Sequence, residues 1–130
     1  MTAAAAPTVV SLAALAMRNT DFRHVVSELS NDAQQVALMC VTPADGGGIR
    51  REVHDASTQT LYIVGGHGTL VTGAERTAQE LAPGAVVVVP PGVEHEVLAE
   101  GTLLLYTTYV PPLHRGAAMH VARRADDPEE

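Results

Sequence analysis

Glycine and proline corners cut this chain into many short apolar runs, and that spacing constrains the fold more than any other feature. Clear corners fall at residues 43–48, 65–68, 83–84 and 90–92. The run Ala85–Val89 between two of them is entirely apolar, which is typical of a buried strand. Short strands at even spacing with Gly/Pro turns predict an all-β sandwich or barrel, and specifically a jelly-roll barrel.

The predicted organisation is one barrel with small additions at each end. Residues 1–17 would form an N-terminal arm and a short helix, which Ser11 would cap and which would reach about Arg18. Residues 18–125 would form the barrel, and residues 126–130 a solvated acidic tail. The predicted strands are Phe22–Leu29, Gln34–Val41, Ile49–His54, Thr60–Val64, Thr69–Thr72, Arg76–Leu81, Ala85–Val89, His95–Leu98 and Thr102–Val110.

Composition limits the class of protein. A chain of 130 residues can bury the core of one domain, and with 46% hydrophobic but only 3% aromatic residues that core must be aliphatic. The net charge of −7 argues against a nucleic-acid surface. The single cysteine, Cys40, excludes an intrachain disulfide and favours a reducing cytoplasm. Arg18 follows the apolar run near the start, the reverse of an export signal, and no stretch is long enough to span a membrane.

Four potential metal ligands fall in two segments that lie far apart in the sequence. Because side chains alternate along a strand, Arg50, Glu52 and His54 are predicted to share one face. The next turn would fold Gln59 back toward His54, and a Pro-Gly turn would deliver His95 at the start of another strand. Any one of these residues alone would more often be a hydrogen-bonded structural group. Together they predict a site for one divalent metal ion inside the barrel.

The same residues resemble the two motifs of a known family. The segment 46–66 has the spacing of the first cupin motif, with Glu52 at the first His position and Gln59 at the Glu position. Residues 84–95 have the form G-x5-P-x-G-x2-H of the second motif, ending at His95. The chain therefore resembles the small single-domain bacterial cupins, in particular a subgroup whose first motif reads EVHxxxDQ. The likeness covers roughly residues 18–125.

The resemblance implies a double-stranded β-helix, one divalent ion (Fe, Mn, Ni or Zn) and a homodimer. The usual cupin ligands are three His and one Glu; here Glu52 replaces a His and Gln59 replaces the Glu, so the formal charge of the set is unchanged. Without Gln59, two His and one carboxylate resemble the facial triad of non-haem iron enzymes. Gln59 could bind directly, bind through water, or orient a ligand water. Thr58 stands where the subgroup usually has Asp, which removes a charge beside the site.

Two functions from different classes stay open. One is a metal-dependent enzyme of isomerase, lyase or oxygenase type that acts on a small molecule inside the barrel. The other is a non-catalytic cupin that binds or senses a small ligand. Arg50 could hold an anionic substrate or simply lie at a strand edge, and either Tyr106 or Tyr109 could direct its hydroxyl into the cavity. We expect a cytoplasmic protein without nucleic-acid or membrane partners.

Overall fold

A computed structural model describes residues 6–18 and 20–113 of the chain. The predicted acidic tail and the last part of the predicted barrel range lie outside these residues. The elements are α1 (Leu12–Arg18), β1 (His24–Val25), the 3-10 turn η1 (Ser27–Leu29), β2 (Gln35–Val41), the 3-10 turn η2 (Pro43–Asp45), β3 (Gly48–Glu52), β4 (Thr58–Thr72), β5 (Thr77–Leu81), β6 (Val86–Val89) and β7 (His95–Val110). The predicted all-β fold with a short N-terminal helix is confirmed.

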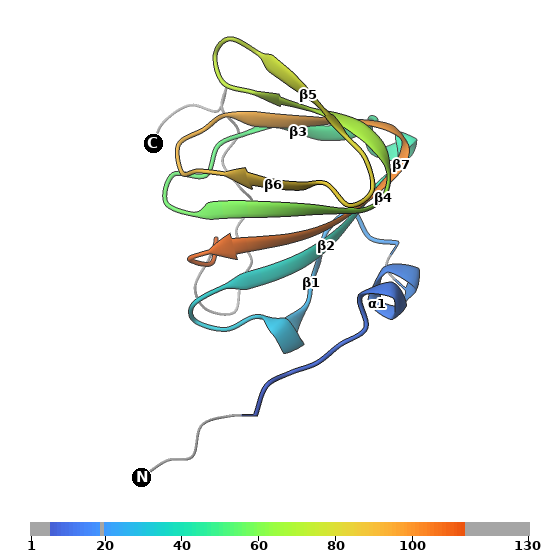
Figure 1. Cartoon of the computed structure of the whole chain (residues 1–130), viewed down its shortest axis with the longest axis vertical. Coiled ribbons are helices and arrows are strands. Elements are labelled where there is room, and N and C mark those ends of the chain that lie inside the picture. Colours follow the sequence, from blue (N-terminus) through green and yellow to red (C-terminus); the bar gives the residue numbers. More distant parts are fainter. Residues whose placement is uncertain (1–5, 19, 114–130) are drawn as a thin grey trace.

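Two long strands, β4 and β7, form the spine of the sheet. They pair antiparallel from Thr58 opposite Val110 to Thr72 opposite His95. The first half of β4 also pairs with β6 and its second half with β5, while β7 pairs with β3 near its start and with β2 near its end. The result is two half-sheets, β1-β2-β7-β4-β6 and β3-β7-β4-β5, that face each other as in a double-stranded β-helix (Figure 1).

The spine strands bend together at a glycine-rich point. The register of β4 on β7 is irregular between Ile63 and His67. Gly66 has a φ of +88°, and a Cβ atom at this position would collide with the carbonyl oxygen of Thr102 on β7. The prediction of two separate strands around this corner was wrong, because the hydrogen-bonded ladder continues through it. The two strands predicted at His95–Leu98 and Thr102–Val110 are likewise one continuous strand, β7.

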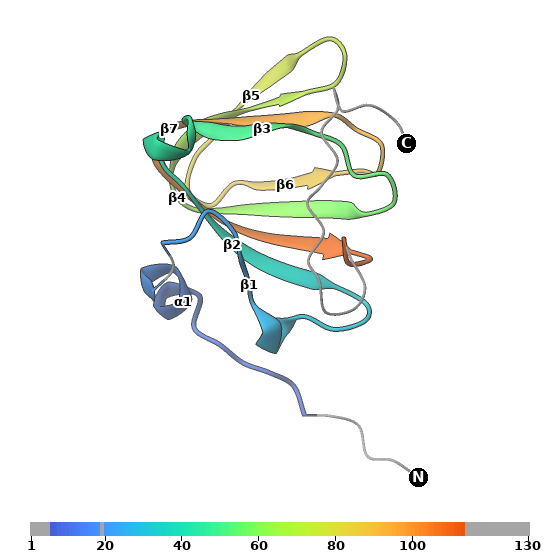
Figure 2. The same ribbon diagram turned by 180° about the vertical axis from the view of Figure 1, so that it is seen from behind.

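The core between the half-sheets is aliphatic, as the composition predicted. Its buried members are Met39, Val41, Ile49, Leu61, Ile63, Leu70, Leu81, Val89, Val97, Leu103 and Leu105. A second cluster lies outside the barrel, where Leu15 of α1 packs with Val26, Val36 and Leu38. Helix α1 therefore covers the outer face of the half-sheet that contains β2 (Figure 2).

The N-terminal segment and the helices differ in part from the sequence expectations. Of the predicted strand Phe22–Leu29, only His24 and Val25 pair with β2, and a 3-10 turn follows. Cys40 is a buried cysteine on β2 and forms no disulfide. Among the described residues, no helix has the length and apolar character that a membrane crossing requires. The expected homodimer and cytoplasmic location stay predictions.

Candidate metal centre

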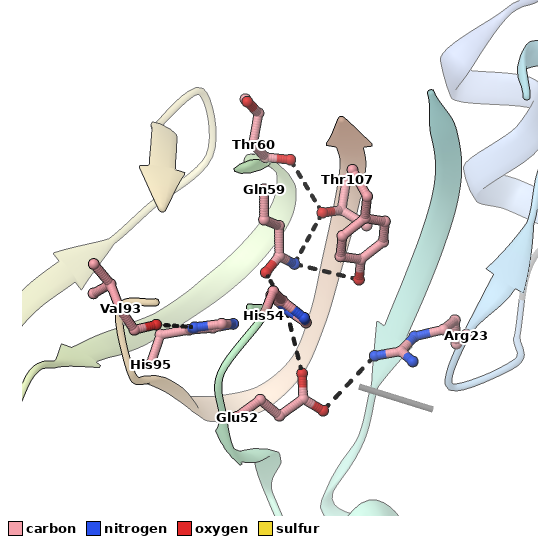
Figure 3. Close-up of polar contacts among 9 residues, drawn as sticks. Arg23, Glu52, His54, Gln59, Thr60, Val93, His95 and Thr107 are labelled. Carbon is pink, nitrogen blue, oxygen red and sulfur yellow. Dashed lines mark hydrogen bonds and ion pairs between the residues drawn. The ribbon is translucent and has the colours of Figure 1, made fainter. Parts of the chain in front are cut away.

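A cluster of potential metal ligands includes His95 and Gln59, which lie near the two ends of the β4–β7 ladder (Figure 3). Glu52 at the end of β3 lies opposite His95 at the start of β7, and His54 follows two residues after Glu52. Their candidate ligand atoms all lie within 4.8 Å of one another, and all three residues are buried. Strand pairing thus brings together a carboxylate and two imidazoles from segments that are distant in sequence.

A β-bulge in β3 decides which side chains face this cluster. Ile49 pairs with Val97 and Glu52 pairs with His95, so β3 contains one residue more than β7 over this interval. Ile49 and Glu52 therefore both point inward, while Arg50 is exposed. The prediction that Arg50 shares a face with Glu52 was wrong, because the bulge interrupts the alternation on which it depended.

His95 directs a lone pair into the cluster. Its Nδ1 lies 3.1 Å from the carbonyl oxygen of Val93. A carbonyl oxygen only accepts hydrogen bonds, so Nδ1 carries the proton and Nε2 is left with its lone pair. Nε2 is buried and has no hydrogen-bond partner. His95 therefore has the arrangement of a metal-binding histidine. A backbone carbonyl accepts a hydrogen bond from one ring nitrogen, and the other nitrogen faces a carboxylate.

His54 and Gln59 are already spaced like neighbouring ligands. The Nε2 atom of His54 lies 2.9 Å from Oε1 of Gln59 and 3.8 Å from Oε2 of Glu52. Two atoms bound at about 2.1 Å and at right angles to one ion lie about 3.0 Å apart. Without an ion, Nε2–H of His54 donates to Oε1 of Gln59. To bind an ion through Nε2, the ring would have to carry its proton on Nδ1, which is buried without a hydrogen-bond partner.

The hydroxyl of Thr107 fixes the orientation of the Gln59 amide. It donates to the carbonyl oxygen of Thr60 at 3.0 Å, so it accepts from Nε2 of Gln59 at 3.1 Å. The second hydrogen of the amide points to the hydroxyl of Tyr109 at 3.3 Å. Because the nitrogen faces these two hydroxyls, the amide oxygen faces His54 and the cluster. Thr107 was not among the predicted site residues; its signal in the sequence is a polar residue that follows Leu103 and Leu105 on the buried face of β7.

Burial keeps the imidazoles neutral. Burial, and then the neighbouring His95, lower the pKa of His54 to about 4. Burial also lowers the pKa of His95 and raises the pKa of Tyr109. Near neutral pH both histidines are therefore uncharged, which is the form of imidazole that binds a metal ion. The phenol of Tyr109 keeps its proton. The residues present fit a divalent ion.

The metal-free protein is expected to lose stability as the pH falls from 6.5 toward 4. In this window an unfolded His54 binds a proton and the folded one does not, so stability falls as the pH falls. The shift corresponds to roughly 3 kcal/mol over the full window. Urea denaturation in the presence of a chelator at pH 7 and pH 4.5 measures it. His54→Gln should remove much of this pH dependence and the exposed control His67→Gln should not; equal curves would contradict the prediction.

The candidate substrate-binding residues lie in different places. Tyr109 is fully buried and its ring lies edge-on to His54, with 5.4 Å between the ring centres. Tyr106 packs instead against the outer cluster that contains Leu15. Arg23, which the sequence analysis did not single out, reaches the cluster: its Nη2 lies 3.8 Å from Oε1 of Glu52. No sequence pattern marks Arg23, since its approach depends on the folding of one half-sheet over the other.

Comparison with known proteins identifies the fold and the family. Residues 37–109 match the family described as the cupin domain, whereas no curated protein matches the chain. The fold is similar to the structure of BH2720 from Bacillus halodurans, with a TM-score of 0.74, 26% identity and coverage of 92% of this chain and 89% of that one. It is also similar to a cupin-2 domain protein from Shewanella frigidimarina, with a TM-score of 0.60, 20% identity and coverage of 77% and 92%.

A third similar structure is described as a predicted oxalate decarboxylase from Thermotoga maritima. Its TM-score is 0.54 and its identity 19%, over 62% of this chain and 69% of that one. At this identity the likeness concerns the fold alone. The family match spans more than half of the chain, from within β2 to nearly the end of β7, and includes the ligand cluster. The protein therefore belongs to the cupin domain family, as the two sequence motifs indicated.

Proposed function

We propose that the protein is a mononuclear metal enzyme that acts on a small molecule between its half-sheets. Glu52, His54 and His95 would hold one divalent ion, with Gln59 as a fourth and weaker ligand. The observation that carries the proposal is the buried, unpartnered Nε2 of His95, which faces a carboxylate and a second neutral imidazole. Fe, Mn, Ni and Zn all accept such a donor set.

The surrounding residues support chemistry on a substrate oxygen. When bound, the ion supplies Lewis acidity toward a carbonyl oxygen, or a site for dioxygen if the metal is iron. Tyr109 keeps its proton near neutral pH, so its hydroxyl can donate a hydrogen bond to a substrate oxygen. Gln59 is held by Thr107 and does not need to reorganise. The aliphatic core beside the cluster would give a bound ion surroundings of low polarity.

Metal content is the first test of the proposal. Protein purified without added metal, and then equilibrated with equal amounts of Mn²⁺, anaerobic Fe²⁺, Ni²⁺ and Zn²⁺, should retain about one ion per chain. His95→Ala should retain roughly a tenth of this or less, because removal of a ligand costs more than tenfold in affinity. The control His67→Ala changes an exposed histidine on β4 and should leave the content unchanged. Equal metal content in all three proteins would remove the proposed site.

Turnover distinguishes an enzyme from a binding protein. The metal-loaded protein is incubated in D₂O with small oxo and hydroxy compounds, and deuterium incorporation next to the carbonyl is followed by proton NMR. Oxygen consumption is recorded in parallel for the iron-loaded form. Either activity in the wild type and His67→Ala, but not in His95→Ala, would support the enzyme. Metal and ligand binding without either activity would instead support the ligand-binding alternative.

A further inference from the structure

Arg23 reaches the ligand cluster from the opposite edge of the barrel. It immediately precedes β1, which ends one half-sheet, whereas Glu52 lies on β3 at the edge of the other (Figure 3). The side chain of Arg23 is 12% exposed, that of Glu52 8%, and that of His54 2%. Of the three side chains, that of Arg23 is thus the most exposed and that of His54 the least.

The protein contacts of this guanidinium do not account for its burial. Its Nη2 lies 3.8 Å from Glu52, which is an ion-pair distance but longer than a hydrogen bond. Its Nε is buried without a hydrogen-bond partner. A guanidinium presents its donors as a planar fork that matches a carboxylate. If Arg23 served only to neutralise Glu52, its guanidinium would be expected to form two short, parallel hydrogen bonds with that carboxylate.

The charges around Arg23 change when Glu52 binds a divalent ion. The two positive charges of the ion exceed the single negative charge of the Glu52 carboxylate. Glu52 and the ion together would therefore present a net positive charge to Arg23. Neither imidazole can supply negative charge, so neither can compensate. A buried cation next to a net positive centre is unfavourable unless an anion lies against both. A single guanidinium matches one carboxylate in charge and shape, whereas a phosphate dianion would need further cations.

We propose that Arg23 binds the carboxylate of the substrate, and that this substrate is a small hydroxy or oxo acid. Its carboxylate would pair with Arg23 while the neighbouring oxygen faces the cluster of Glu52, His54 and His95. This inference depends on the proposed function, since it needs the ion at Glu52. It assigns to Arg23 the anion-binding role that the sequence suggested for Arg50, which is exposed on the far side of the β3 bulge.

Glycolate and glycolamide test this assignment, because the two molecules have nearly the same shape and differ in charge. Isothermal titration calorimetry is performed on protein loaded with the ion that it retains from the metal mixture. The wild type should bind glycolate more tightly than glycolamide. Arg23→Gln should weaken glycolate binding by about tenfold or more, with glycolamide binding and metal content unchanged. The matched control Arg50→Gln removes the same charge outside the cluster and should behave as the wild type.

Arg23→Lys keeps the charge but loses the fork, and should recover only part of the glycolate affinity. If Arg23→Gln binds glycolate like the wild type, or loses its metal together with glycolate, the assignment is overturned; in the second case Arg23 acts only through Glu52. A metal-loaded wild type without a preference for glycolate would contradict this inference alone. A wild type that takes up no metal would contradict the proposed function itself.

Discussion

Glu52→Gln is expected to lower the affinity of the protein for its divalent ion by about a hundredfold or more, which corresponds to roughly 2.7 kcal/mol. Glu52 is the one carboxylate in the cluster with His54 and His95. Glutamine keeps the shape of the side chain and removes its charge, so a dication would face only neutral donors. The substitution also leaves the buried guanidinium of Arg23 without its counter-charge, so the metal-free variant is expected to be less stable than the metal-free wild type, and each metal-loaded protein is compared with its own metal-free form.

Thermal denaturation with and without the metal measures this effect. An ion that binds only the folded state raises the melting temperature by mass action, so the wild type should be stabilised and Glu52→Gln hardly at all. Glu94→Gln is the matched control. This residue pairs with Arg51 at 3.7 Å on the surface, with 37% of its side chain exposed, and the change is chemically identical. A metal-dependent stabilisation of Glu52→Gln equal to that of the control would contradict the role of Glu52.

The fold class could be predicted because its signals are local. Apolar runs and Gly/Pro corners mark strands and turns without reference to the rest of the chain. Whether a glycine corner ends a strand or only bends it is not local. In β4 the ladder continues because Gly65 pairs with Leu104 and Gly68 with Ala99, both of which lie on β7. A sequence read segment by segment cannot show this, so one bent strand was predicted as two.

The site residues could be predicted where side chains alternate regularly along a strand, and could not be predicted where a bulge or a contact between sheet edges decides their position. The spacing of Glu52, His54, Gln59 and His95 predicted their convergence, and strand pairing does bring these four residues together. Arg50 and Arg23 lie at positions that alternation along one strand does not predict. Alternation with a period of two cannot predict a bulge, so Arg50 was placed on the same face as Glu52. The approach of Arg23 depends on how two sheet edges face each other.

Gly66→Ala is expected to destabilise the protein by about 3 kcal/mol or more, because it combines two separate costs. A Cβ atom at a φ of +88° is strained for any L-residue, and here it would also collide with the carbonyl oxygen of Thr102. The obstacle is the backbone of β7, the partner strand of β4, and it cannot move aside as a flexible side chain would. Urea denaturation at neutral pH, in the presence of a chelator, measures the loss.

Gly73→Ala separates the two costs. Gly73 has a φ of +74°, but a Cβ atom there would meet nothing within 4 Å, so only the backbone strain of about 1 kcal/mol applies. The difference between the two variants therefore measures how much the close approach of β4 and β7 at the bend contributes. Equal destabilisation would mean that the bend tolerates a wider separation of these strands. The cluster would then be positioned by the pairings near His95 and Gln59 alone, with no contribution from the bend.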